Sequence, residues 1–419
     1  MAPPFSHCFR PQDYEDVNLF VDRETLIEHM QQCLRSLMDP DVVGESSLFV
    51  VGSRGVGKSI LTRKALHEVI RERGPLYVKI DCAKLPHGSE SMLRELARCL
   101  AREAIENISE KQVQLRISAE LLLRLASKTQ VKVKEVRTWS SELKLGFSAK
   151  SKFTDALQFD FGMTRLAGKS RQVEESFERA IDAEYLKRLI DDFIADCAMA
   201  SERVVLFIDN LDQVRAPEKA DEITKVTDLA RYLVGLGRCL MIATLRSEFI
   251  GQDLLKLQAQ RIDVPGMQPE ELQLVARRRM GLTTPAKQGA LRDAGFPGLF
   301  ERLSTWTQNP WGFLTWLALF DSTPEPYDAG QPDTLIQVLL KRARMQYSAL
   351  REDELRRVAA AYRDRPNEDA TQSQLAGEGV DAGLLGRAVH HGLLHPDWLL
   401  DPQRYALAPF LHFLSISQP

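Results

Sequence analysis

The residues best suited to chemistry in this sequence form a glycine-rich loop that ends in Gly-Lys-Ser. The loop completes the pattern G-x-x-x-x-G-K-[ST] without a missing position, through Gly52, Ser53, Arg54, Gly55, Val56, Gly57, Lys58 and Ser59. In such a loop the glycines let backbone N–H groups surround phosphates, the lysine reaches the β- and γ-phosphates, and the hydroxyl ligates Mg²⁺. The pattern therefore predicts a nucleotide site, with Lys58 on the phosphates and Ser59 on the metal.

A phosphate loop of this kind requires a strand before it and a helix after it. Residues 47–51, Ser-Leu-Phe-Val-Val, form a short apolar run that fits a buried parallel strand. From Ile60 onward, apolar residues recur at helical spacing up to residue 73. The helix would then begin at the phosphates, where its amides and dipole favour negative charge, so Ile60 joins the expected nucleotide-binding residues.

Three further apolar segments predict strands, at residues 76–81, 203–208 and 239–243. Strands that alternate with helices imply an α/β fold with a parallel sheet. The last two segments are followed by Asp209 and Thr244, and ligands of such sheets bind beyond the carboxyl ends of the strands. Asp209 is therefore our candidate for the second Mg²⁺ ligand, together with the loop serine.

A long insertion separates the second predicted strand from the third. Its middle, residues 128–171, carries ten Lys and Arg against four Asp and Glu. Alternating segments such as residues 131–134 and 157–161 predict a basic β-hairpin or ribbon there. Two interpretations stay open: a surface that contacts nucleic acid, a protein partner or a membrane, or a charged hairpin that only keeps the chain soluble.

The composition of the chain is that of a globular protein with room for two or three domains. It has 419 residues, 44% of them hydrophobic, and a formal net charge of −3, which argues against a globally basic surface for nucleic acid. Its six cysteines form no C-x-x-C pair, which favours reduced thiols over zinc ligands or disulfides. No apolar stretch reaches the roughly 18 residues of a membrane span, and the first residues do not resemble a signal peptide. We therefore expect a cytoplasmic protein without a transmembrane segment.

Four segments in a fixed order resemble the AAA+ superfamily, and within it the origin-recognition-type and STAND ATPases. They are residues 20–24, the phosphate loop, residues 206–212 and residues 243–246. The resemblance implies a P-loop parallel-sheet AAA+ core over residues 1–265, with the basic β-rich insert at about 128–171. It further implies a helical lid at 266–332 and a C-terminal winged-helix domain at 333–419.

The resemblance assigns roles to residues that follow the third predicted strand. Asp209 takes the place of the Walker B carboxylate, and Asn210 stands where AAA+ proteins usually carry the glutamate that polarises water. STAND proteins have a second acid three positions after the first, which makes Asp212 the candidate catalytic base. The alternative is that Asp212 only caps the helix that follows. Because Asn210 cannot accept a proton and Gln213 replaces an acid, the resemblance implies slow hydrolysis.

Other positions of the resemblance concern the γ-phosphate and the adenine. Thr244 corresponds to the polar γ-phosphate sensor and Arg246 to the STAND sensor arginine. Arg261 corresponds to the arginine finger that completes a neighbour's site, or it is an ordinary surface arginine. Pro310 lies in the lid segment that STAND proteins place near the adenine, whereas no arginine occupies the usual second-sensor position. The chain has no Asn-Lys-x-Asp motif to select guanine, so ATP with Mg²⁺ is the expected ligand pair.

The C-terminal residues weigh against DNA binding. Residues 333–419 carry ten Lys and Arg against eleven Asp and Glu. The helix expected to act as the recognition helix offers only Arg387, with His390 and His391. Binding to DNA phosphates requires more positive charge than this. A role in contacts with the lid or with a protein is therefore favoured for this region.

These observations favour an ATP-binding and ATP-hydrolysing switch that controls its own assembly as a homo-oligomer, or a protein partner. The alternative is a DNA-binding loader of the origin-recognition or transposition type that uses the winged helix and the basic insert. A third interpretation is a nucleotide-stabilised scaffold without turnover, because of Asn210 and Gln213. The sequence leaves the partner, the pathway and the number of subunits open.

Overall fold

The computed structural model describes the parts of the chain that form its helices and strands. These are residues 9, 23–38, 47–73, 76–85, 88–109, 112–142, 151–160, 178–200, 202–213, 220–246, 259–293, 295–321, 332–363, 370–391, 393–397, 404–408, 411 and 413. Along the chain they hold a parallel-sheet core with an insertion, four helices in the region expected to form the lid, and a C-terminal group of helices and strands. Among them, no helix combines the length and the apolar character needed to cross a membrane.

Five parallel strands form the central sheet, in the order β2-β5-β6-β1-β7. Their bounds are β1 (Ser47–Val51), β2 (Leu76–Asp81), β5 (Val204–Asp209), β6 (Cys239–Leu245) and β7 (Gln260–Asp263). The strands β1, β5 and β6 are buried along their whole length, which explains their nearly continuous apolar runs. All four pairings between neighbouring strands are parallel. The predicted α/β fold with a parallel sheet is therefore confirmed.

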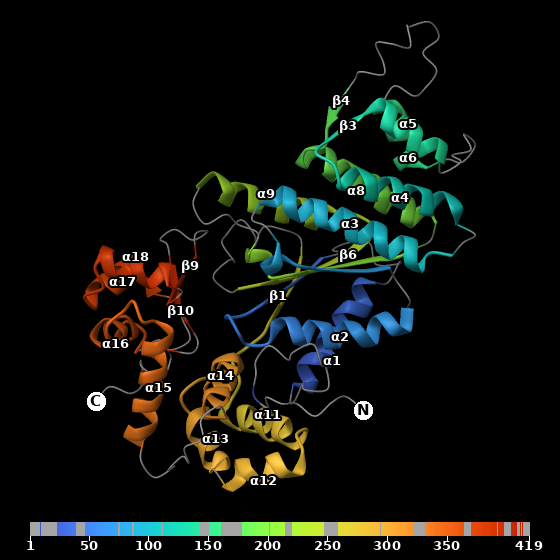
Figure 1. Ribbon diagram of the computed structural model, residues 1–419. Helices are drawn as coiled ribbons and strands as arrows, with labels where there is room; N and C mark the ends of the chain where they lie inside the picture. The colour runs from blue at the N-terminus through green and yellow to red at the C-terminus, as the bar shows by residue number, and fades with distance from the viewer. Residues whose placement is uncertain are drawn as a thin grey trace, which may run out of the picture.

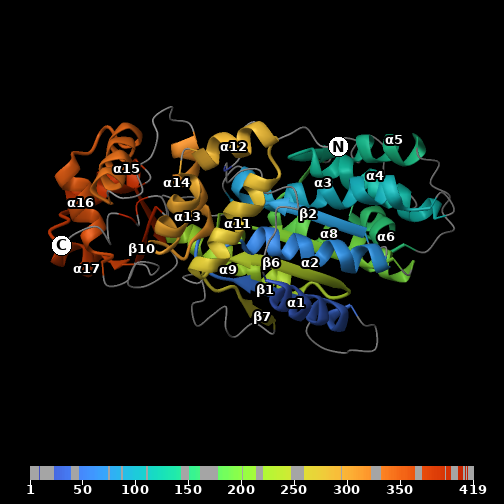
Figure 2. The same cartoon turned by 90° about the horizontal axis from the view of Figure 1, so that it is seen from below.

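Helices cover both faces of this sheet, as Figure 1 and the view from below in Figure 2 show. One face is covered by α1 (Glu24–Leu37) and α2 (Lys58–Arg73), and the other by α3 (Ser89–Asn107), α4 (Val113–Ala126), α8 (Ala183–Met199) and α9 (Ala220–Gly235). Successive residues of a strand point to opposite faces, so Val50 packs with α1 and α2 while Phe49 and Val51 pack with the other group. Helices thus cover both faces of the sheet, and the carboxyl ends of the strands remain available for a ligand site.

The insertion between β2 and β5 is mainly helical. After η2 (Cys82–Lys84) it contains α3 and α4, then β3 (Gln130–Lys132), α5 (Val133–Glu142), α6 (Lys152–Asp160), β4 (Glu178–Ala180) and α8. In Figure 1, β3, β4, α5 and α6 lie beyond α4 and α8 as seen from the sheet. The insertion therefore extends one face of the core away from the sheet.

The prediction of a β-rich insert is wrong for the described residues. The strands β3 and β4 pair antiparallel over only three residues each, whereas α5 and α6 are helices. Phe153 and Leu157 of α6 are both buried, and their four-residue spacing places them on one helical face. Asp196 of α8 accepts backbone N–H groups at the start of α6 and so caps it. The burial and the cap therefore favour a helix here, although the apolar residues alternate from Leu157 onward. Residues 143–150 and 161–171 of the expected insert lie outside the described part of the chain.

Helices dominate the chain after β7. Residues 266–332, the expected lid, contain α11 (Pro269–Gly281), α12 (Pro285–Asp293), α13 (Phe296–Ser304) and α14 (Pro310–Asp321). They are followed by α15 (Pro332–Gln346), α16 (Glu352–Ala360), β8 (Ala370–Thr371), α17 (Gln372–Gly377), α18 (Ala382–His390), β9 (Leu394–Asp397) and β10 (Arg404–Leu407). The strand β10 pairs antiparallel with both β8 and β9. This order of elements fits a winged helix, which remains our interpretation of residues 333–419.

The lid and the C-terminal group share one hydrophobic core. Phe313 and Leu317 of α14 and Leu339 of α15 belong to a single buried cluster that extends to Phe413. The ring of Trp316 meets the ring of Phe413 edge-on, with 6.2 Å between the centroids. The boundary we expected between residues 332 and 333 therefore divides the sequence but not the core.

Candidate nucleotide site

The phosphate loop connects β1 to α2 at the carboxyl edge of the sheet. Gly55 and Gly57 have φ angles of +82° and +97°, a region that residues with a side chain disfavour. A Cβ on Gly55 would also lie 2.5 Å from the side-chain oxygen of Asn309. Glycine is thus required for the backbone turn and, at Gly55, for the close approach of the lid. The helix α2 begins at Lys58, so its first amides face the end of the loop.

The side chain of Lys58 folds back over the loop. Its Nζ donates to the carbonyl oxygen of Gly52 at 2.8 Å and to that of Ser53 at 2.9 Å. The ammonium group therefore lies inside the phosphate loop, where it was predicted to contact the phosphates. A phosphate oxygen is a stronger acceptor for this cation than a neutral carbonyl, so the arrangement suits an exchange of partners when phosphates arrive.

Asp209 holds together the ends of three elements. Its Oδ1 accepts a hydrogen bond from Ser59 Oγ at 2.6 Å and another from Thr244 Oγ1 at 2.7 Å. Ser59 comes from α2, Asp209 from β5 and Thr244 from β6. The predicted Mg²⁺ ligands Ser59 and Asp209 are thus neighbours, and both offer the oxygen atoms that Mg²⁺ prefers. Among the described residues, there is no group of three or more His, Cys, Asp or Glu side chains that could hold a metal ion.

Asp212 and Arg246 form a buried ion pair beside the loop. Arg246 Nε lies 2.5 Å from Asp212 Oδ2, and the two residues are 4% and 2% exposed. Gln213 Nε2 donates to the same carboxylate oxygen at 3.3 Å. Asp212 lies in the short helix η3 (Leu211–Gln213), and its carboxylate contacts the side chains of Arg246 and Gln213. The ion pair therefore holds the Asp212 carboxylate in a fixed position beside the phosphate loop.

Asn210 is held at both its backbone and its side chain. Its φ of +56° lies in the left-handed region, which asparagine tolerates better than most residues. Its backbone N–H donates to Thr244 Oγ1 at 2.8 Å, and its Nδ2 donates to Asp81 Oδ1 at 2.9 Å. Asp81 was not predicted as a site residue, although it ends β2 as Asp209 ends β5, and the two are register partners. That repeated pattern was the signal in the sequence.

The lid contacts the phosphate loop directly through the start of α14. Asn309 Oδ1 accepts the backbone N–H groups of Trp311 and Gly312 at 3.1 Å each, and so caps the helix. Its Nδ2 donates to the carbonyl oxygen of Arg54. The Trp311 N–H also lies 3.3 Å from the carbonyl oxygen of Gly55. One asparagine thus joins the lid to the loop, which sequence reasoning did not predict.

A cavity of about 350 Å³ opens between the loop, the strand ends and the lid. Its charged lining consists of Arg23, Arg54, Lys58, Arg246 and Arg279 against Asp209 and Asp212. Burial, together with the nearby charge of Arg246, lowers the pKa of Arg54, but a guanidinium stays protonated at neutral pH. The excess of positive charge and the size suit a polyphosphate ligand.

Most of the predicted site residues meet at this cavity. The cavity is lined by residues 54–60, Asp209, Asp212, Arg246 and Pro310. Thr244 does not line it but donates a hydrogen bond to Asp209. Pro310, Trp311 and Leu314 form an apolar part of the wall, and the contact of Pro310 with adenine stays a prediction.

Arg261 lies elsewhere. It is on the edge strand β7, its side chain is 40% exposed, and Nε and Nη2 lie 2.9 and 2.6 Å from Asp263 Oδ1. It is not among the residues that line the cavity. Its role as an arginine finger stays a prediction.

Two cavity arginines were missed by sequence reasoning. Arg23 is buried, and it donates to the carbonyl oxygens of Val56 at 3.1 Å and Pro265 at 2.7 Å, which ties the loop to the segment that leads into the lid. Arg279 comes from α11 and is also buried. Its position four residues after Val275, on the same helical face, was the available signal.

Comparison with protein families gives one match. The model of the AAA ATPase domain matches residues 19–236, just over half of the chain, from the segment before α1 through the phosphate loop to the end of α9. No curated protein sequence matches the chain.

Comparison with solved structures gives distant similarities over nearly the whole length. A Walker-type ATPase of Pyrococcus abyssi is 15% identical, with 99% of each chain covered and a TM-score of 0.43. The Aeropyrum pernix ORC1 protein, solved in complex with DNA, is 10% identical over 97% of this chain and 94% of that one, with a TM-score of 0.43. The Aeropyrum pernix ORC2 protein is 11% identical over 94% of each, with a TM-score of 0.40.

Proposed function

Because this chain belongs to the AAA ATPase domain family, we propose that it is an ATP-binding and ATP-hydrolysing switch that controls its own oligomerisation or a protein partner. The observation that carries this proposal is the cavity in which the phosphate loop, the strand-end carboxylates and the lid all meet. A ligand bound there contacts the core and the lid at once. Its loss or hydrolysis therefore changes the contacts between them.

Each part of ATP has candidate partners in the cavity. Lys58 and the loop amides, up to Ile60, face the phosphates, while Arg54, Arg246 and Arg279 add positive charge. Ser59 and Asp209 would hold Mg²⁺, and the metal would supply positive charge to offset that of the phosphates. The apolar wall with Pro310 and Trp311 suits the adenine.

The lid contacts supply the route from the nucleotide to the rest of the molecule. Asn309 and Trp311 bond to loop carbonyls next to the residues that would hold the phosphates. The helix α14 that they begin is buried in the core shared with α15 and residue Phe413. A displacement of the loop would thus move the lid and the C-terminal group together, because packed cores respond as units.

Substitution of Lys58 tests the nucleotide site. Lys58→Ala should weaken ATP binding by about 10- to 100-fold, since it removes charged hydrogen bonds to phosphate. Lys64→Ala is the matched control, because it removes a lysine of the same helix whose side chain does not line the cavity. Titration with a fluorescent ATP analogue and a phosphate-release assay measure binding and turnover. Unchanged ATP affinity and turnover in Lys58→Ala would contradict the assignment of the nucleotide site to the phosphate loop.

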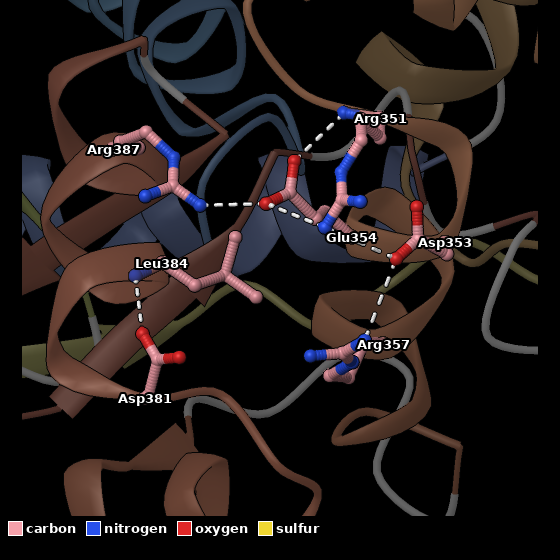
Figure 3. A network of polar contacts seen from close by, with 7 residues as sticks. All are labelled: Arg351, Asp353, Glu354, Arg357, Asp381, Leu384 and Arg387. Atoms are coloured by element: carbon pink, nitrogen blue, oxygen red, sulfur yellow. Dashed lines mark hydrogen bonds and ion pairs between the residues drawn. The ribbon is translucent and has the colours of Figure 1, made fainter.

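The alternative proposal, a DNA-binding loader, finds some support in the insertion. Lys132, Lys134 and Lys152 are exposed there, although Lys128 is paired with Glu135 at 3.2 Å. The C-terminal group offers less positive charge for DNA. Figure 3 shows that Arg387 of α18 points to Glu354 of α16, with 2.6 Å between Nη2 and Oε1. The only Lys or Arg of the expected recognition helix is therefore partly neutralised within the protein.

Binding to duplex DNA separates the two proposals. The switch predicts no measurable binding at low salt in the presence of ATP. The loader predicts binding whose log affinity falls steeply with log salt concentration, as lysines displace counterions from DNA phosphates. Steep salt dependence that disappears when Lys132, Lys134 and Lys152 are replaced by Glu would favour the loader.

A further inference from the structure

A groove lies between the end of α15 and the start of α16, and it shares no lining residue with the nucleotide cavity. Its volume is about 820 Å³. Of its apolar lining residues, Leu340 and Leu350 are buried and form the floor, whereas Met345 and Ala349 are exposed. Figures 1 and 2 place both helices at the end of the molecule opposite the insertion. The groove is therefore a surface feature of the C-terminal group.

Met345 is the most exposed large apolar side chain in the described part of the chain. It is 67% exposed, and Val113, which follows it, is 59% exposed but does not line the groove. Methionine is flexible and polarisable, so it adapts to the shape of a partner and is common on protein-binding surfaces. Covering Met345 and Ala349 would remove apolar surface from water without any loss of polar contacts.

The edge of the groove carries an excess of positive charge. Lys341, Arg344 and Arg351 line it and are exposed, against Glu352 as the one acidic lining residue. Among the described residues, Lys341 has no acidic partner. Glu352 is engaged outside the groove, because its Oε1 accepts from Nε and Nη2 of Arg356 at 3.2 and 3.1 Å. The groove therefore favours an acidic occupant.

The two arginines are held only loosely by their own neighbours. Arg344 Nη1 lies 3.4 Å from Glu352 Oε2. Arg351 Nη2 lies 3.5 Å from Asp353 Oδ2 and 3.6 Å from Glu354 Oε1 (Figure 3). Exposed pairs of this kind contribute little stability, because water screens them and two long side chains must be ordered. Both guanidinium groups can thus turn to carboxylates of a partner.

The segment that joins α15 to α16 also approaches the phosphate loop. Tyr347 precedes the groove residue Ser348, is buried, and accepts the N–H of Leu350 on its carbonyl oxygen at 2.9 Å. Burial raises the pKa of the Tyr347 hydroxyl to about 12, and the nearby charge of Arg54 opposes that rise. One short segment therefore borders the groove on one side and the phosphate loop on the other.

We propose that this groove binds an amphipathic helix with acidic flanks, which belongs to the protein partner of the switch. The identity of the helix as part of that partner rests on the proposed function. Apolar side chains one turn apart on the helix would cover Met345 and Leu350, and flanking carboxylates would pair with Lys341, Arg344 and Arg351. The phosphates of duplex DNA would satisfy the positive edge but would leave the apolar residues uncovered, so the groove favours a protein.

Designed peptides test the groove in the full chain. The acidic peptide is a helix of about 15 residues, roughly four turns, with Leu along one face and Glu on the flanks. The basic peptide keeps the Leu face and carries Lys in place of Glu. Fluorescence polarisation at low salt, without nucleotide, should show at least about 10-fold tighter binding of the acidic peptide. Duplex DNA added in excess should not displace it.

Variants of the groove locate the binding site. Met345→Glu should weaken binding of the acidic peptide by at least about 10-fold, because it places a carboxylate among the apolar residues. Met199→Glu is the matched control, since Met199 is also exposed but lies at the end of α8. Lys341→Glu with Arg344→Glu should reverse the preference, so that the basic peptide binds more tightly. A misfolded protein would not give that reversal.

The outcomes separate this proposal from the proposed function. Tighter binding of the acidic peptide, weakened by Met345→Glu and reversed by the double variant, supports the groove. Equal binding of both peptides, wild-type affinity in Met345→Glu, or displacement by DNA overturns it. A groove that fails in a protein that still binds ATP leaves the nucleotide site intact. Peptide binding in a protein that binds no ATP would instead support the groove and end the switch.

Discussion

Among single residues, Asp209 connects most of the chemistry at the sheet edge. One of its oxygens accepts two hydroxyl groups, those of Ser59 and Thr244, at 2.6 and 2.7 Å. A single carboxylate thus sets the position of the expected metal ligand on one side and of the expected γ-phosphate sensor on the other. These two roles are separable by experiment, because only one of them depends on Mg²⁺.

Replacement of this carboxylate should abolish the effect of Mg²⁺. In Asp209→Asn the side chain keeps its shape but loses its charge, so the gain in ATP affinity on adding Mg²⁺ should shrink by about 10- to 100-fold. Affinity in EDTA should stay close to that of the wild type. Titration calorimetry with and without Mg²⁺ measures both. Thr244→Ser, which keeps the hydroxyl, is the control, and an Asp209→Asn protein with full Mg²⁺ dependence would contradict the assignment.

Among single residues, sequence reasoning predicted those site residues that belong to a motif of consecutive positions. The loop residues and Asp209 lie where their motifs place them, because the chain itself fixes their neighbours. Arg279 was missed because it reaches the cavity from α11 by tertiary packing, and Asp81 because it meets the cavity residue Asn210 from the end of β2. Such contacts depend on how elements pair, and single-sequence patterns carry little of that information.

At the scale of elements, one side chain at the start of α14, that of Asn309, makes two kinds of contact. Asn309 caps the helix through Oδ1 and joins it to the phosphate loop through Nδ2. An aspartate in its place would keep the capping acceptor and lose the donor to the loop. Capping and lid attachment can therefore be measured apart.

The variant Asn309→Asp should keep the stability of the protein and loosen the lid. We expect its free energy of unfolding to stay within about 0.5 kcal/mol of the wild type, whereas Asn309→Ala should lose about 1 kcal/mol because the cap is gone. Both variants should release a fluorescent ATP analogue faster than the wild type does. Chemical unfolding and stopped-flow dissociation give the two quantities. An Asn309→Asp protein with the dissociation rate of the wild type would show that the lid is held by other contacts.

The insertion shows where element prediction failed. The alternation of apolar residues near Leu157 has the period of a strand, yet Phe153 and Leu157 also share a helical face. Short apolar segments satisfy both periods, and the choice was made by burial against α8 and by the cap from Asp196. The strands β1, β5 and β6 were predicted correctly because they are buried on both faces and need no periodicity, whereas the edge strand β7 was not predicted as a strand.

At the scale of the whole molecule, the packing favours two bodies rather than three. The sheet and its helices have their own apolar clusters, while the lid and the C-terminal group share another. The family resemblance implied a boundary between residues 332 and 333, but it did not show which side chains pack together across that boundary. The phosphate loop and Asn309 lie where the two bodies meet, so under the proposed switch function nucleotide exchange would change their relative position.

Assembly is the remaining question at this scale, and Arg261 allows it to be tested. The side chain is on the edge strand β7 with only an exposed contact to Asp263, and such surface pairs contribute less than about 1 kcal/mol. The phosphates of a neighbouring subunit could therefore recruit it. If Arg261 completes that site, specific ATPase activity should rise with protein concentration, and Arg261→Ala should lose activity without losing ATP affinity. Arg261→Ala mixed with Lys58→Ala should regain activity, because the first supplies an intact phosphate loop and the second an intact arginine. Activity independent of concentration, with no gain on mixing, would instead assign hydrolysis to the single chain.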